Sequence, residues 1–268
     1  MVRFNGMRFF LPVIALWWRE LVRFYRQPSR LVGALGTPLI FWLLIGSGIG
    51  DSFRPLSTGD NINYLEYFYP GTIVMVVLFT SIFSTISIIE DRANGFLLAV
   101  LVAPVARSSL VLGKVLGGAT LAFLQGFLFV LLAPIMAGIP LSFAKIVELT
   151  PVLFAIAFAL TAVGFSFAWK INSSQGFHVV MNLVLFPMWI LSGALFPPSG
   201  ASQWVKWVMT INPLAYGVSS VRHILYSENL ILAAGFPPLF YSVLVTVLFG
   251  LFAFGCSLFL VLRPNRGG

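Results

Sequence analysis

The sequence predicts an all-α integral membrane protein with six transmembrane helices. Of the 268 residues, 59% are hydrophobic and 9% are charged, whereas roughly a quarter of the residues in a soluble domain are charged. Six stretches without Asp, Glu, Lys or Arg each reach the ~20 residues that a helix needs to cross a bilayer. Their apolar residues run continuously, which favours helices over the alternating strands of a barrel. The stretches are 31–50, 67–89, 115–144, 149–169, 171–205 and 229–262.

The charged residues are divided unequally between the two sides that six spans define. The side that holds both termini carries twelve of the 16 Lys and Arg residues and three of the 8 Asp and Glu residues. Because basic residues accumulate in cytoplasmic segments, both termini are predicted to be cytoplasmic. The net charge of +8 is then explained by membrane orientation, and a nucleic-acid partner is not expected.

Residues 1–30 are predicted to form a cytoplasmic amphipathic helix, before a second unit over 31–268. On a helix, four apolar side chains share one face: Ile14, Trp17, Leu21 and Phe24. Three basic side chains share the other face: Arg19, Arg23 and Arg26. We expect this helix to lie in the membrane interface with its arginines toward lipid phosphates. The alternative is the first turn of a long span, although Pro28 interrupts the helix there.

The connection between the second and third spans, about 91–104, is too long for a tight turn. It is predicted to hold one short helix between Gly95 and Pro104, preceded by Glu90, Asp91 and Arg92. Four residues would form an apolar ridge on this helix: Phe96, Leu97, Val100 and Leu101. An exposed apolar ridge suits docking onto another protein, and equally a helix resting on the membrane.

The fifth uncharged stretch is too long for one simple helix. Pro187 predicts a kink, and Gly193, Phe196 and Pro197 lie where the helix is expected to break. Such a break at membrane depth is tolerated only where protein or a cavity surrounds it. Two short helices, about 201–211 and 213–226, should follow and re-enter the membrane or lie at its outer surface. Asn212 is the expected N-cap and Pro213 the first helical residue of the second one.

The sequence predicts no catalytic residue, no metal site and no cofactor bound by this chain. Gly113-Lys114 lacks the upstream glycine of a phosphate-binding loop, so ATP hydrolysis is not expected here. His178 and His223 have no metal-ligating neighbours, and Cys256 lies in an apolar run. The uncharged stretches also lack the ionisable residues that ion-coupled transport requires.

The segment from Glu90 to Arg107, followed by Leu112-Gly113-Lys114, resembles the coupling-helix signature of ABC type-2 export permeases. This family includes drug-resistance, polysaccharide and nodulation-factor export permeases. Further similar motifs are Tyr69-Pro70-Gly71, Ser192-Gly193, Phe196-Pro197 and Asn212-Pro213-Leu214. The resemblance covers nearly the whole chain in the same order.

The resemblance implies a permease of the bacterial cytoplasmic (inner) membrane. An N-terminal elbow helix, a coupling helix at about 91–104 and outer re-entrant or gate helices at about 193–226 would accompany the six spans. The partners would be two copies of an ABC ATPase, which bind ATP and Mg, and a second permease, most simply in a homodimer. The helix after Gly95 would sit in a cleft of the ATPase, and Glu90, Asp91 and Arg92 would contact or orient it. A lipid, amphiphile, drug or glycan would cross between the permeases. The alternatives are an ATPase-independent channel or flippase, or a membrane assembly scaffold.

Overall fold

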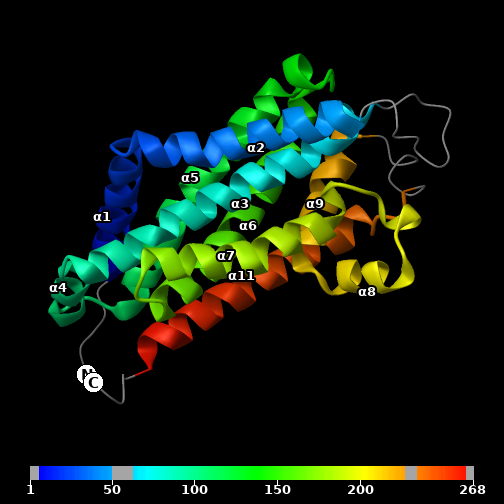
Figure 1. Cartoon of the computed structure of the whole chain (residues 1–268). Coiled ribbons are helices and arrows are strands. Elements are labelled where there is room, and N and C mark those ends of the chain that lie inside the picture. Colours follow the sequence, from blue (N-terminus) through cyan, green and yellow to red (C-terminus); the bar gives the residue numbers. More distant parts are fainter. Residues whose placement is uncertain (1–5, 50–62, 227–233, 264–268) are drawn as a thin grey trace.

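The computed structural model describes residues 6–49, 63–226 and 234–263, and these residues form helices and connections without a β-strand. The long helices lie side by side, and α1 crosses one end of the bundle (Figure 1). The start of α1, all of α4 and the end of α11 lie at this end, whereas α8 lies at the opposite end. In chain order the elements are α1 (Gly6–Tyr25), α2 (Pro28–Ile49), α3 (Tyr64–Ala93), α4 (Phe96–Val102), α5 (Arg107–Met136), α6 (Phe143–Lys170), α7 (Ser174–Trp189), the π-helical turn η2 (Ile190–Ala194), the 3-10 turn η3 (Pro198–Gly200), α8 (Gln203–Ile211), α9 (Pro213–Leu225) and α11 (Leu239–Leu262).

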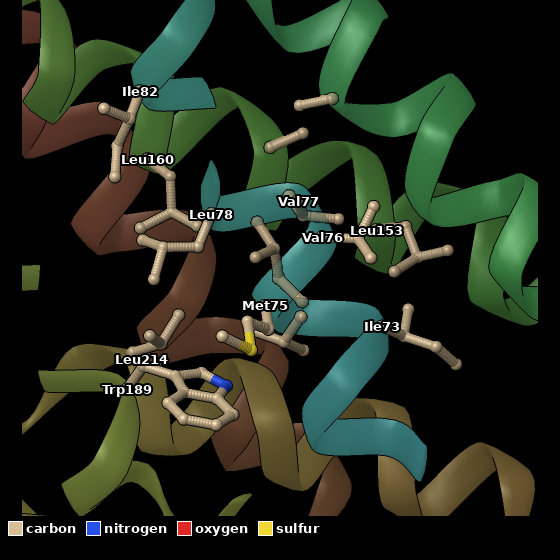
Figure 2. Close-up of a cluster of buried hydrophobic side chains, with 14 of the residues drawn as sticks. Ile73, Met75, Val76, Val77, Leu78, Ile82, Leu153, Leu160, Trp189 and Leu214 are labelled. Atoms are coloured by element: carbon tan, nitrogen blue, oxygen red, sulfur yellow. The ribbon is translucent and has the colours of Figure 1, made fainter. Parts of the chain in front are cut away.

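Helix α3 is the centre of the bundle. It packs against α2, α5 and α6. In its most apolar segment 89% of the residues are buried, compared with 22% in that of α11. Figure 2 shows Ile73, Met75 and Leu78 of α3 among side chains of α6, α7 and α9. Because α11 leaves most of its apolar surface uncovered by protein, this surface is suited to contact with lipid.

Small residues bring the central helices close together. A Cβ atom on Gly118 of α5 would lie 2.5 Å from the Ser84 Oγ of α3 and 2.7 Å from the Thr161 Cγ2 of α6. Nothing larger than glycine therefore fits at this three-helix contact without a shift. Packing through small residues is usual in membranes, where lipid removes the hydrophobic force between helices.

Five helical segments are long and apolar enough to cross a membrane: α3, α5, α6, α7 continued through η2, and α11. The first predicted span coincides with α2, whose apolar run, Val32–Gly48, is shorter than that of the other five. The multi-pass, all-helical class is thus confirmed for the described residues. The full count of six spans stays a prediction.

Candidate functional site

The corner between α3 and α4 depends on a glycine. Gly95 has a φ of 73°, in the left-handed region that residues with a Cβ atom rarely adopt. Its amide donates to the carbonyl of Arg92, and the amide of Asn94 donates to that of Glu90, which closes the last turn of α3. The chain then reverses into α4, a helix of 7 residues that ends before the exposed Pro104.

The two faces of α4 differ in their surroundings. Leu97 is 4% exposed and forms a small apolar cluster with Leu16 of α1 and Leu110 of α5. The other ridge residues, Phe96, Val100 and Leu101, pack around this cluster. The predicted ridge is therefore not the exposed face, because the helical period turns it toward α1 and α5. The exposed apolar residues of α4 are Leu98 and Val102, at 66% and 77%.

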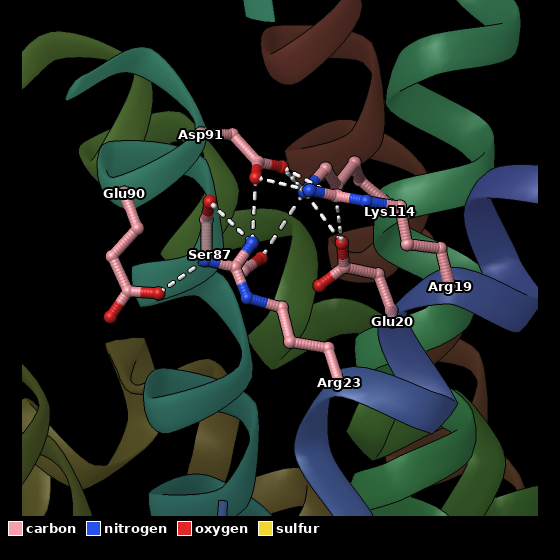
Figure 3. A network of polar contacts seen from close by, with 7 residues as sticks. All are labelled: Arg19, Glu20, Arg23, Ser87, Glu90, Asp91 and Lys114. Atoms are coloured by element: carbon pink, nitrogen blue, oxygen red, sulfur yellow. Dashed lines mark hydrogen bonds and ion pairs between the residues drawn. The ribbon is translucent and has the colours of Figure 1, made fainter. Parts of the chain in front are cut away.

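Next to this cluster, an ion-pair network joins α1, α3 and α5 (Figure 3). Asp91 accepts two hydrogen bonds from the Arg19 guanidinium, at 2.9 and 2.7 Å, and one from Arg23, at 2.6 Å. Lys114 Nζ contacts both Asp91 and Glu20, the latter at 2.6 Å. Arg23 also binds Glu90. The network thus balances three cations with three carboxylates.

The centre of this network is buried, since Glu20, Asp91 and Lys114 are each at most 4% exposed. Burial of charges is tolerated where each has opposite charges and hydrogen bonds around it. The hydrogen bonds to Asp91 raise the pKa of the Arg19 guanidinium above its usual value. The same guanidinium stacks on Phe96, 3.7 Å from the ring centroid, and so connects the network to α4.

These contacts bear on two expectations from the sequence. Arg19 and Arg23 point toward the carboxylates of α3 rather than only toward lipid phosphates, because α1 packs closely against the bundle. Asp91 is 1% exposed and held by this chain's own cations, so its carboxylate is not available to a partner protein. Arg26 is exposed, and its interfacial role stays a prediction.

Two glycines allow α1 to approach α5. A Cβ atom on Gly113 would lie 2.9 Å from the Leu16 Cβ, and one on Gly117 would lie 2.7 Å from the Glu20 Cβ. Trp17, expected in the interface, donates from Nε1 to Thr120 Oγ1 of α5 at 3.0 Å. The spacing of Gly113 and Gly117 is the small-xxx-small pattern of close helix pairs, and this signal could have predicted the contact.

Arg92 connects the α3–α4 corner to a different part of the bundle. Its guanidinium donates to the carbonyls of Trp169 and Ile171, at 2.6 and 3.1 Å, and to Asn172 Oδ1 at 2.7 Å. These groups lie where α6 ends and α7 follows, and the last carbonyls of a helix need such partners. Arg92 therefore has a structural role within the chain.

At the other end of the bundle, the break predicted around Gly193 is present. Gly193 has a φ of 81° and is buried within η2. Phe196 and Pro197 follow η2 before the turn η3. Asn212 caps α9 by accepting from the Leu214 amide, and its Nδ2 donates back to the carbonyls of Met188 and Leu191, at 2.6 and 2.9 Å. Pro213 occupies the first position of α9, as predicted.

Arg222 of α9 satisfies the carbonyl groups that this break leaves without helical partners. It donates to the carbonyls of Gly193 and Ala194, at 3.1 and 3.2 Å, and to that of Tyr67, at 2.7 Å. Its guanidinium also lies 4.0 Å from the centroid of the Tyr67 ring. Arg222 falls in the outer helix predicted at about 213–226, and its burial inside the bundle was not predicted.

The histidines and carboxylates offer no clear metal centre. Within residues 6–49, 63–226 and 234–263, no three His, Cys, Asp or Glu side chains gather in a way that could hold an ion. His223 Nε2 lies 2.8 Å from the Pro237 carbonyl, and His178 packs on the Phe83 ring. The chemistry of the described sites is that of ion pairing, hydrogen bonding and apolar contact.

Comparison with known proteins decides the family. Residues 12–226 match the family model described as ABC-2 type transporter. The chain belongs to the ABC-2 type transporter family. This permease family forms the transmembrane component of ABC transporters and works with a separate ATPase. The match covers most of α1, the α3–α4 corner and the break with its two short helices.

Several named proteins align with most of this ABC-2 permease. The putative transport permease ycf38 of Cyanophora paradoxa is 29% identical over 79% of this chain and 72% of its own. Nodulation protein J of Rhizobium meliloti (strain 1021) is 27% identical over 81% of this chain and 82% of its own. The daunorubicin resistance ABC transporter permease protein DrrB1 of Streptomyces coeruleorubidus is 23% identical over 78% of this chain and 73% of its own.

Proposed function

We propose that this chain is the permease subunit of an ATP-driven exporter and acts as a dimer with two ABC ATPase subunits. Both termini face the cytoplasm of a bacterial cell, and the chain crosses the inner membrane six times. The substrate passes between the two permeases and is a lipid, an amphiphile, a drug or a glycan. The name of one relative, which concerns daunorubicin resistance, supports including drugs in this range.

The observation that carries this proposal is the exposed face of α4. Leu98 and Val102 are large apolar side chains, separated by one helical turn, at the end of the bundle that also holds α1. The opposite face of α4 is anchored by Leu97. A short helix that is held on one side and apolar on the other is suited to insertion into a cleft of a partner protein. In this proposal the cleft belongs to the ATPase.

The network next to α4 supplies a connection from this docking face to the spans. Phe96 stacks on Arg19, and Arg19 binds Asp91 at the end of α3. Since Lys114 joins Asp91 to α5, a displacement of α4 is passed to three helices together. Closure of the ATPase dimer on ATP would thus move α1, α3 and α5 as one unit. In this proposal Asp91 and Arg92 make contacts within the permease, and Leu98 and Val102 contact the ATPase.

The test is copurification of the ATPase with the permease in mild detergent. Replacing both exposed residues, Leu98→Asp with Val102→Asp, should reduce recovery of the ATPase at least about tenfold, because two carboxylates would enter an apolar contact. The matched control is Phe143→Asp, which changes an exposed apolar residue at the opposite end of the bundle and should leave recovery unchanged. Size-exclusion profiles of all variants check that the permease is folded.

Two results would contradict the proposal. If the folded double variant recovers as much ATPase as the original chain, α4 does not dock through Leu98 and Val102. If purified permease without any ATPase moves substrate across vesicle membranes at the full rate, the ATPase-independent channel or flippase is favoured instead.

A further inference from the structure

Two adjoining hollows lie at the end of the bundle opposite α4. The first, of about 540 Å³, is formed by α8, the start of α9, the segment Gly235 to Pro238 and the start of α11. The second, of about 510 Å³, runs between the α8–α9 corner and the outer face of α11. Their walls share Thr210, Tyr216 and Tyr241, so the two hollows adjoin at these residues. Neither belongs to the α4 site.

The first hollow has the chemistry of a headgroup site. Lys206, which is partly buried, is the one charged side chain among the described residues that line it. Five hydroxyl groups also line the wall. Those of Ser192, Thr210 and Tyr216 donate to backbone carbonyls of this chain, and the other two belong to Ser199 and Tyr241. The ammonium group of Lys206 at this polar wall is complementary in charge to a phosphate group.

The second hollow has the chemistry of an acyl-chain groove. Four apolar residues of α11 line it: Val245, Leu248, Phe249 and Phe252. From Tyr241 to Phe252 the helix rises about 17 Å at about 1.5 Å per residue. This length matches one leaflet of a hydrocarbon core that is roughly 30 Å thick.

The position of α8 indicates where the two hollows lie relative to a bilayer. Trp204 and Trp207 of α8 are both exposed, and tryptophan accumulates at the level of lipid headgroups. Lys206 belongs to the same helix, two residues after Trp204. The headgroup hollow would therefore lie in the interface, with the groove extending below it into the hydrocarbon of the same leaflet.

We propose that these hollows bind one phospholipid with an anionic headgroup, its phosphate at Lys206 and one acyl chain along α11. The site goes beyond the export function, because it is built within one chain and requires neither ATP nor the ATPase. A bound lipid would cover the exposed side of the corner between α8 and α9, which follows the break at Gly193. It would thereby hold these short helices against α11.

The experiment is native mass spectrometry of the purified full-length chain with phosphatidylglycerol or phosphatidylcholine of identical acyl chains. The original chain should retain one phosphatidylglycerol in preference to phosphatidylcholine. Lys206→Gln should reduce this preference about three- to tenfold, the range expected for losing a partly exposed charge-assisted hydrogen bond. Lys170→Gln, an equal charge change at an exposed residue at the end of α6, should leave the preference unchanged.

A second pair of variants tests the groove. Val245→Phe fills the groove and should reduce retention of both lipids, whereas Val247→Phe changes a neighbouring α11 residue outside the groove and should not. Equal retention of the two lipids by the original chain would overturn the proposal. So would unchanged retention in both Lys206→Gln and Val245→Phe, or equal losses in Val245→Phe and Val247→Phe. None of these outcomes bears on ATPase copurification, so the two proposals fail separately.

Discussion

Among the carboxylates of the described residues, Asp91 is the most deeply buried. It is 1% exposed and receives cations from two other helices, namely Arg19 and Arg23 of α1 and Lys114 of α5. The folded chain keeps this group charged because the three cations replace the water that it loses. The same arrangement makes the loss of its charge costly, since the cations would remain.

We predict that Asp91→Asn lowers the stability of the purified permease by about 3 kcal/mol, within the range for breaking a buried ion pair. Glu90→Gln is the matched control, since it removes one carboxylate charge from the adjacent residue. Glu90 is more exposed than Asp91, and its variant should lose less than about 1 kcal/mol of stability. Thermal denaturation in detergent measures both. Similar melting temperatures for the two variants would show that Asp91 has no special role.

At the scale of elements, the docking of α1 depends on the absence of side chains at two positions of α5. We predict that Gly117→Val separates α1 from α5, because the new Cβ atom would lie 2.7 Å from that of Glu20. Hydrogen exchange should then become faster throughout α1 and remain unchanged in α6. Gly36→Val is the control, since a Cβ atom there would have nothing within 4 Å. Faster exchange of α1 in both variants would point to a general loss of stability.

The sequence predicted those elements whose signals are local. Asn212-Pro213 marks the start of α9, and Gly95 and Pro104 bracket α4, since caps and turns depend on neighbouring residues. The partners of α1 could not be predicted in this way. Arg19 and Asp91 are 72 residues apart, and only tertiary packing brings them together. The ridge on α4 was assigned outward because Leu16 of α1, which covers it together with Leu110 of α5, is distant from it in sequence.

The buried arginine in α9 illustrates the same limit. Charged residues inside the membrane are rare, and the sequence assigned Arg222 to the outer side, in the predicted helix 213–226. Its burial follows from the break at Gly193, whose carbonyls need donors. Sequence alone predicts the break but not which side chain satisfies it.

At the scale of the whole molecule, α2 decides the topology. If α2 crosses the membrane, the end of α1 and the start of α3 lie on opposite sides. We predict that cysteines at Tyr25 and Asn63, both exposed, react with impermeant reagents from the cytoplasmic and outer sides respectively. The background carries Cys256→Ser, since Cys256 is the one cysteine of the sequence. Labelling of both positions from the same side would exclude α2 as a span.

The contact between α1 and α5 also has a consequence for biosynthesis. Lys114 leaves the ribosome about 90 residues after the end of α1, which takes roughly 5 to 20 s at the usual rates of translation. During this interval the lysine that binds Glu20 does not yet exist, and the nascent α1 must shelter its apolar side chains without α5. Because its sequence is amphipathic, α1 can lie on the membrane surface at that stage. The interfacial position predicted from the sequence would thus serve the chain during assembly.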